Sequence, residues 1–126
     1  MRAPESLPAL RVVASPATLD GLAWPDGVTA LRLATDDLLI IGKAMVALDD
    51  EPAIVEKDAG YAGWWLTPDE FADAVLPHVD WALPVTRPVL AQGLVAGVPA
   101  KIWLTDDRAL LLCAVAYAHE LAERLA

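Results

Sequence analysis

The sequence predicts an α+β fold, in which an antiparallel sheet built from two hairpin-containing halves carries two or three helices packed mainly on one face. Three observations predict this class. Apolar runs occur in two pairs, and a short turn containing two aspartates joins each pair. Residues 67–70 carry the signals of a helix start. Residues 116–125 repeat apolar side chains at helical spacing.

Residues 1–27 are interpreted as a lead-in segment, because they show no sustained period of apolar residues. Prolines and glycines interrupt this stretch: Pro4, Pro8, Pro16, Gly21, Pro25 and Gly27. One short strand is expected within it, at residues 10–14. Residues 28–126 are expected to form a single α+β domain, since a chain of 126 residues has the usual length of one domain.

Two hairpins of the same plan are predicted. The first joins residues 30–33 to residues 38–41, and the second joins residues 100–104 to residues 109–115. Both turns contain the sequence Thr-Asp-Asp, which fits a chance use of turn-forming residues and a domain of two related halves equally well. The second strand of each hairpin is apolar at every position, which predicts burial on both of its faces.

A well-marked helix is predicted after residue 66. Thr67 supplies an N-cap hydroxyl, Pro68 suits the first helical position, and Glu70 completes a capping box. The helix is expected to end at Pro77, because proline cannot continue the backbone hydrogen bonds. Its buried side is expected to contain Phe71, Ala72, Val75 and Leu76.

The closing helix at residues 116–125 is predicted to be amphipathic. Tyr117, Leu121 and Leu125 recur at intervals of four residues and are expected to face the core. Glu120 and Arg124 can form an ion pair on the opposite side.

Two more strands are predicted between the hairpins, at residues 53–56 and 61–66, and are expected to pair with each other, antiparallel. The second of them contains Trp64 and Trp65. Because successive side chains of a strand point to opposite faces, one of the two indoles must lie on the face that the helices do not cover. That face, which also carries Trp103, is expected to be covered by the lead-in segment or by another protein.

Composition excludes several classes of function. The formal net charge is −9, with 18 acidic residues against nine basic ones, which opposes binding to a nucleic-acid phosphate backbone. No apolar run reaches the roughly 18 residues of a membrane-spanning helix, so no membrane association is expected. The first residues lack the profile of a secretory signal, and a cytoplasmic location is therefore expected. The lone Cys113 lies in an apolar run and is interpreted as a small buried hydrophobe.

The residues of catalytic and metal sites are sparse. His119 and Glu123 form an i, i+4 pair that is interpreted as a solvated helix face, and no metal site is predicted. His78 precedes Asp80, and this pair reads as a helix-end cap or, less favoured, as a base with its orienting acid. The acidic clusters at residues 36–37, 49–51 and 106–107 all fall in predicted turns. Although a Mg²⁺ or Ca²⁺ site in one of them is conceivable, solvated turns are the commoner meaning. We expect no catalytic residue.

Tryptophan is the remaining signal, with five residues in a chain that has a single phenylalanine. An indole has a large apolar body and one donor, which suits a core, an interface or a flat heterocyclic ligand. Arg87 or Lys101 could supply the polar group of a ligand pocket. The candidates for binding a ligand or partner are Trp64, Trp65, Trp81, Trp103, Arg87 and Lys101.

Taken in order, several segments resemble one family: residues 31–42, 53–66, 67–76, 89–93, 100–104 and 106–125. They are similar to the strands, capped helix, hairpin and closing helix of the γ subunit of heterotetrameric sarcosine oxidase. That family is related to the folate-binding aminomethyltransferase domain of the glycine cleavage system. The chain is a divergent and shortened member of this pattern, since only residues 43–52 stand where the family has a full helix.

The resemblance implies a small accessory subunit that packs on larger, flavin-dependent oxidoreductase subunits and has no catalytic residues of its own. It implies no cofactor bound by this chain alone, with folate as a possible ligand. Two alternatives stay open beside this accessory or interaction role. One is a stand-alone domain that binds a folate-like or other heterocycle, and the other is a self-associating dimer without a ligand.

Overall fold

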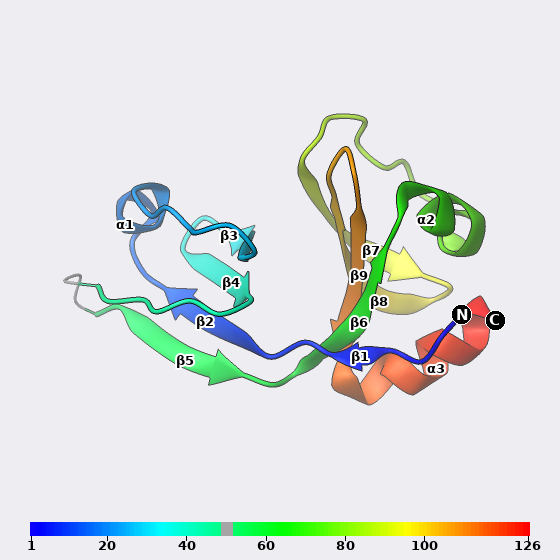
Figure 1. The fold of residues 1–126 in the computed structure, drawn as a ribbon, viewed down its shortest axis with the longest axis horizontal. Helices are drawn as coiled ribbons and strands as arrows, with labels where there is room; N and C mark the ends of the chain where they lie inside the picture. Colours follow the sequence, from blue (N-terminus) through cyan, green and yellow to red (C-terminus); the bar gives the residue numbers. More distant parts are fainter. Residues whose placement is uncertain (49–51) are drawn as a thin grey trace. The chain divides into compact units, whose positions relative to one another are not determined.

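The computed structural model describes residues 1–48 and 52–126 and divides the chain into two compact units (Figure 1). The N-terminal unit is Leu7–Ala59, and the C-terminal unit is Gly60–Ala126 together with Met1–Ser6. Each unit contains an antiparallel sheet and at least one helix, which confirms the α+β class. The division differs from the expected lead-in at residues 1–27 and single domain at residues 28–126, because residues 7–27 supply a strand and a helix to the N-terminal unit.

The N-terminal unit contains a four-stranded sheet in the order β3-β4-β2-β5. The strands are β2 (Ala9–Val13), β3 (Thr29–Ala34), β4 (Asp37–Ile41) and β5 (Ile54–Asp58). The first predicted hairpin is confirmed as β3 and β4. The strand expected within the lead-in is confirmed as β2, which pairs with both β4 and β5.

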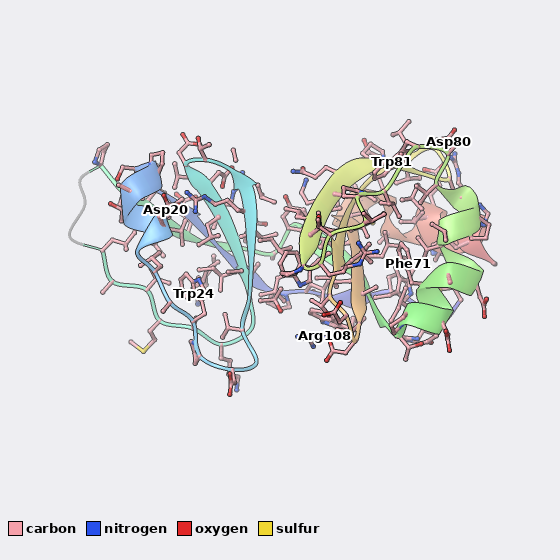
Figure 2. All side chains as sticks on the ribbon, turned by 90° about the horizontal axis from the view of Figure 1, so that it is seen from above. Asp20, Trp24, Phe71, Asp80, Trp81 and Arg108 are labelled. Carbon is pink, nitrogen blue, oxygen red and sulfur yellow. The ribbon has the colours of Figure 1, made fainter. Side chains whose placement is uncertain are left out.

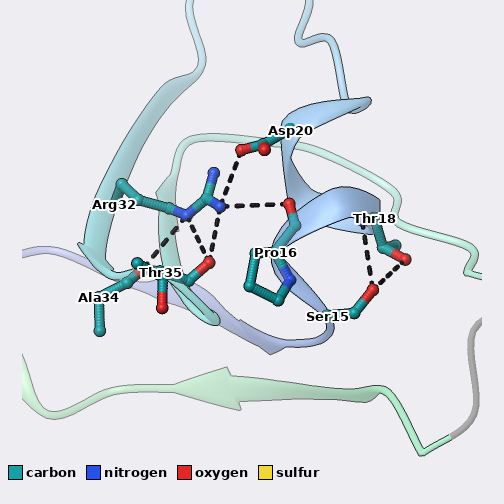
Figure 3. A network of polar contacts seen from close by, with 7 residues as sticks. All are labelled: Ser15, Pro16, Thr18, Asp20, Arg32, Ala34 and Thr35. Atoms are coloured by element: carbon teal, nitrogen blue, oxygen red, sulfur yellow. Dashed lines mark hydrogen bonds and ion pairs between the residues drawn. The ribbon is translucent and has the colours of Figure 1, made fainter.

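One face of this sheet carries the core of the N-terminal unit: Val12, Ala14, Leu19, Leu38 and Ile40. Helix α1 (Pro16–Asp20), which Ser15 caps, contributes Leu19 to it. Arg32 ties this helix to the β3–β4 turn (Figure 3). Its guanidinium donates to the carboxylate of Asp20 at 2.9 Å and to the carbonyl of Thr35 at 2.6 Å.

The other face of this sheet carries an ion pair between strands. Arg11 on β2 donates to the carboxylate of Asp37 on β4 through two nitrogens. A third contact joins Arg11 to Asp58 on β5 at 3.8 Å. One partly buried guanidinium therefore links its own strand, β2, to the two neighbouring strands β4 and β5.

The C-terminal unit contains a five-stranded antiparallel sheet in the order β1-β6-β9-β8-β7. The strands are β1 (Glu5–Ser6), β6 (Tyr61–Leu66), β7 (Val89–Val95), β8 (Val98–Leu104) and β9 (Ala109–Ala114). The second predicted hairpin is confirmed as β8 and β9. The expected pairing of residues 53–56 with residues 61–66 is wrong, because β5 pairs with β2 and β6 pairs with β9 and β1. The charged β5 is an edge strand, whereas the apolar β6 lies inside its sheet.

Helices α2 (Pro68–Ala74) and α3 (Val115–Leu125) lie on the same side of the five-stranded sheet (Figure 1). They contribute Phe71, Ala118, Leu121 and Leu125 to one core with the first face of the sheet, and Val75, which directly follows α2, belongs to the same core. In the described part of the chain, residues 1–48 and 52–126, no helix is both long and apolar enough to cross a lipid bilayer.

The capping box is confirmed. The Glu70 N–H donates to the Thr67 hydroxyl at 3.1 Å, and the Thr67 N–H donates to the Glu70 carboxylate at 2.9 Å. Phe71 and Val75 are buried as expected, but Ala72 is exposed and Leu76 is 43% exposed. The α-helix already ends at Ala74, and Pro77 lies in the following 3₁₀ turn (Leu76–His78), which rotates Leu76 away from the core.

The closing helix differs from expectation at one residue. Ala118, Leu121 and Leu125 are buried, whereas Tyr117 is 46% exposed. The core-facing stripe follows alternating intervals of three and four residues rather than intervals of four alone. The predicted ion pair between Glu120 and Arg124 is confirmed at 2.6 Å.

Replacing Thr67 by alanine is expected to lower the free energy of unfolding by about 1 kcal/mol, because the first turn of α2 loses its side-chain acceptor. Urea unfolding followed by circular dichroism measures this change. Thr86→Ala is the control, since Thr86 lies in an exposed loop. Equal midpoints for Thr67→Ala and the wild type would contradict a stabilising cap.

The ionisation of Glu70 makes the stability contributed by the start of α2 depend on pH. The hydrogen bond from the Thr67 backbone, with help from the Thr67 side chain and Arg2, lowers the pKa of the Glu70 carboxyl. A folded-state pKa below the unfolded one stabilises the fold above the unfolded pKa, and this gain is lost as the pH falls through the folded pKa. We expect the stability difference between the wild type and Glu70→Gln to shrink from about pH 7 to about pH 2. Urea midpoints measure it, and a difference that is constant over this range would exclude the effect.

Candidate functional site

Strand pairing sorts the aromatic residues of the C-terminal sheet onto two faces. On the second face, away from α2 and α3, one row runs across four strands: Trp65, Leu110, Trp103 and Leu90 stand directly opposite one another in turn. Trp64 belongs instead to the core on the first face. The expectation that Trp64 and Trp65 point to opposite faces is confirmed, and Trp65 and Trp103 share a face.

Trp64 and Trp65 have different surroundings. Trp64 is 1% exposed, and its indole N–H donates to the Arg2 carbonyl at 2.7 Å, which makes it a core residue with a satisfied donor. Trp65 is partly buried, and the guanidinium of Arg108 stacks over its ring at 4.1 Å from the centroid.

A hollow of about 440 Å³ lies beside the row of Trp65, Leu110, Trp103 and Leu90 on the second face. Its lining includes Tyr61, Gln92, Leu94, Lys101 and Tyr117. The Lys101 ammonium lies 5.9 Å from the centroid of the Tyr61 ring and donates to the Gln92 side-chain carbonyl at 2.9 Å. We call these five residues the Lys101 hollow. An ammonium group beside phenol rings suits a ligand or side chain that carries a negative charge next to a flat or apolar part.

The surroundings of the Lys101 hollow are apolar. Of the side chains that line it, Leu94 is 51% exposed and Tyr117 is 46% exposed. Large side chains of this kind cost free energy in water, and they are typical of surfaces that bind something.

Trp81 and Arg87 are two of the predicted site residues that do not line this hollow. Trp81 packs beside β7 (Figure 2), with its indole N–H donating to the Leu94 carbonyl at 2.7 Å. A methyl group built on Gly93 would come within 2.6 Å of that ring, so the ring occupies the space that a side chain there would need. Arg87 lies in the loop before β7, where it donates to the carbonyls of Pro84 and Thr86 at 2.7 and 2.9 Å.

Of the six candidates, Lys101 alone lines the hollow, and Trp65 and Trp103 lie on the same face. Sequence reasoning missed Tyr61, Gln92, Leu94 and Tyr117. The two-residue period of their strands was visible for the first three, but their proximity depends on the strand order β6-β9-β8-β7, which the sequence does not display.

Cys113 also lines this hollow. Burial raises the pKa of the Cys113 thiol, which disfavours the reactive thiolate. His119 and Glu123 are 3.1 Å apart on a highly exposed helix face, as predicted. No group of three or more His, Cys, Asp or Glu that could hold a metal ion occurs in residues 1–48 and 52–126. The acidic cluster of Asp49, Asp50 and Glu51 lies outside these described residues.

A second hollow, of about 560 Å³, lies within the N-terminal unit. Lys43 and Lys57 line it together with mainly apolar neighbours, among them Leu10 and Met45. None of the residues predicted from the sequence lines it.

No family model, curated protein or solved structure matches the chain. The evidence for function therefore comes from the residues and from their arrangement.

Gly93→Ala is expected to lower the free energy of unfolding by about 1–3 kcal/mol, because the added methyl group meets the ring of Trp81. Gly21→Ala is the matched control, since its methyl group would have only ordinary contacts at 3.7 Å. Combining Gly93→Ala with Trp81→Leu should cost less than the sum of the two single changes in urea unfolding. Strictly additive effects would show that Trp81 does not restrict position 93.

Proposed function

We propose that this chain is a non-catalytic accessory subunit, as its resemblance to the sarcosine oxidase γ-subunit family implies, and that it binds a larger oxidoreductase subunit through the Lys101 hollow. The observation that carries the proposal is the combination of one ammonium group with the exposed apolar side chains Leu94 and Tyr117 in one hollow. Interfaces between proteins commonly have an aromatic and apolar centre around a few well-placed polar groups.

The chemistry of the hollow defines the partner surface. An aspartate or glutamate of the partner, flanked by apolar side chains, would bring its carboxylate to Lys101 while its neighbours cover Leu94 and Tyr117. Because the chain carries a net charge of −9, a lysine within an apolar surface is a specific attachment point for an acidic group. The pair would be desolvated on binding, so losing one partner should weaken the complex strongly.

A stand-alone ligand-binding role is the second candidate. The volume of about 440 Å³ falls within the usual range for sites of small molecules. The phenol rings of Tyr61 and Tyr117 could flank a flat heterocycle, and Lys101 could receive its carboxylate, as a folate-like ligand would require. The accessory role and the ligand-binding role use the same side chains of the same hollow. They differ in what fills it, a partner protein or a small molecule.

The accessory role carries no cofactor on this chain alone and places the protein in the cytoplasm. A single free thiol, buried at Cys113, is compatible with a reducing compartment.

The test is purification of the tagged chain from its native host, with the mass of the complex measured by light scattering. We expect a larger flavin-containing protein in stoichiometric amount, identified by its absorption spectrum. Lys101→Glu and Tyr117→Ala should each reduce its recovery at least about tenfold. Lys43→Glu, which changes a lysine of the other hollow by the same charge, should leave recovery unchanged.

The alternatives give different results. An uncomplexed chain that releases a light-absorbing small anion on denaturation, but not as Lys101→Glu, would replace the partner with a ligand. An uncomplexed chain that releases nothing, or equal recovery of the flavoprotein by all variants, would contradict the use of the Lys101 hollow.

A further inference from the structure

The second hollow, of about 560 Å³, lies at the border of the core of the N-terminal unit. Leu10 and Ala44 line it, and both pack against that core. Strand pairing places Lys57 directly opposite Leu10, so the Lys57 side chain stands beside Leu10 on the core face of the sheet, at the edge strand β5. We call this space, whose lining also includes Lys43 and Met45, the Lys57 hollow.

The segment that directly follows β4 supplies part of this lining, and a glycine holds its start in place. Gly42 has a φ of 115°, a backbone conformation that glycine adopts without strain. A methyl group built on Gly42 would also come within 2.8 Å of the Gly27 carbonyl oxygen. The chain therefore turns at a restricted position and leads directly into Lys43, Ala44 and Met45, which all line the hollow.

The uncharged part of the lining is small and aliphatic. It includes Pro8, Ala9, Leu10, Ala44, Met45 and Ala59, and none of the described residues that line the hollow is aromatic. Met45 is 100% exposed, so its flexible and polarisable side chain is available to an occupant. Such a lining suits a flexible alkyl group, whereas a flat heterocycle binds best against an aromatic ring.

The charged side chains determine which head group suits the hollow. Lys43 and Lys57 are both exposed, so an ion can approach their ammonium groups. Among the described lining residues Asp58 supplies the one carboxylate, and it lies 3.8 Å from the guanidinium of Arg11. Because Arg11 offsets this negative charge, the two ammonium groups set the sign of the hollow. Two cations on a chain of net charge −9 are complementary to a single anionic group.

We propose that the Lys57 hollow binds a small amphiphile with one carboxylate head group and a medium-length alkyl chain. The head group contacts the ammonium groups of Lys43 and Lys57. The alkyl chain covers Leu10, Ala44 and Met45. The volume of about 560 Å³ is within the usual range for small-molecule sites. The occupant is a free molecule rather than a lipid in a bilayer, because a net charge of −9 opposes approach to an anionic membrane surface.

Isothermal titration calorimetry of the purified chain with sodium dodecanoate, below the critical micelle concentration, tests this site. We expect one equivalent to bind, with a dissociation constant of about 0.1–1 mM. Octanoate should bind at least about tenfold more weakly, because its shorter chain buries fewer methylene groups. Binding that does not saturate, or equal affinity for the two carboxylates, would contradict an alkyl-binding site.

Variants of the lining separate the head group from the chain. Lys43→Glu and Lys57→Glu should each weaken dodecanoate binding about five- to tenfold, because a carboxylate replaces an ammonium group. Met45→Ser should weaken it about threefold through lost apolar contact. Lys101→Glu is the matched control, since it makes the same change of charge in the Lys101 hollow and should bind dodecanoate as the wild type does. Circular dichroism verifies that each variant is folded.

Two-dimensional amide NMR locates the bound dodecanoate independently of the variants. The largest shifts should occur at residues 42–45 and 57–59, and not at Tyr117 of the Lys101 hollow. Wild-type affinity in both Lys43→Glu and Lys57→Glu, a loss of binding in Lys101→Glu alone, or the largest shifts at Tyr117 would each overturn the proposal. Binding to phosphatidylglycerol vesicles that Lys57→Glu abolishes would overturn the choice of a free molecule. These experiments use the purified chain, so their outcome is independent of the partner proposed above.

Discussion

The arrangement of the C-terminal unit depends on the burial of β9 on both faces. Five consecutive residues, 109–113, are buried, and β9 is hydrogen-bonded to β6 on one side and to β8 on the other. Since successive side chains alternate between faces, the register of β9 fixes which residues of its neighbours share a face. This register places Trp64 in the core with Leu111, and Trp65 and Trp103 beside Leu110 on the opposite face. A shift by one residue would exchange the two sets.

The local elements could be predicted from the sequence, and the long-range pairings could not. The turns of both hairpins and the Thr67 capping box are encoded within a few residues, and all three are confirmed. The pairing of β6 with β9 places Tyr61 opposite Ala114, far apart in the chain. Nothing in the sequence of either strand identifies the other strand as its partner. The same limit applied to the site: Lys101 was identified from its own chemistry, whereas Tyr117 was assigned to the core. In α3, a stripe at residues 117, 121 and 125 and a stripe at residues 118, 121 and 125 differ by only a small rotation of the helix. The sequence therefore could not decide whether Tyr117 or Ala118 faces the core.

The basic residues divide into two structural roles. The three lysines of the chain line the two hollows, with Lys101 in one and Lys43 and Lys57 in the other. Arginines instead join elements to one another, as Arg11 does between strands and Arg32 does between a helix and a turn. The planar guanidinium suits fixed, multiple hydrogen bonds, whereas an ammonium group on a flexible stem adapts to an incoming anion. The lysines thus line the hollows, whereas Arg11 and Arg32 connect secondary-structure elements.

Strand β7, Val89-Leu90-Ala91-Gln92-Gly93-Leu94-Val95, is symmetric about Gln92 except at Ala91 and Gly93, and the contact between Trp81 and Gly93 accounts for this exception. An alanine at position 93 would complete the mirror relation with Ala91, but its methyl group would occupy the space of the indole ring. The packing of a single chain therefore forbids the perfectly symmetric strand and permits only the sequence that departs from it by one methyl group. Position 93 is therefore restricted by the packing of its own unit, whereas the side chain of Leu94 beside it is 51% exposed.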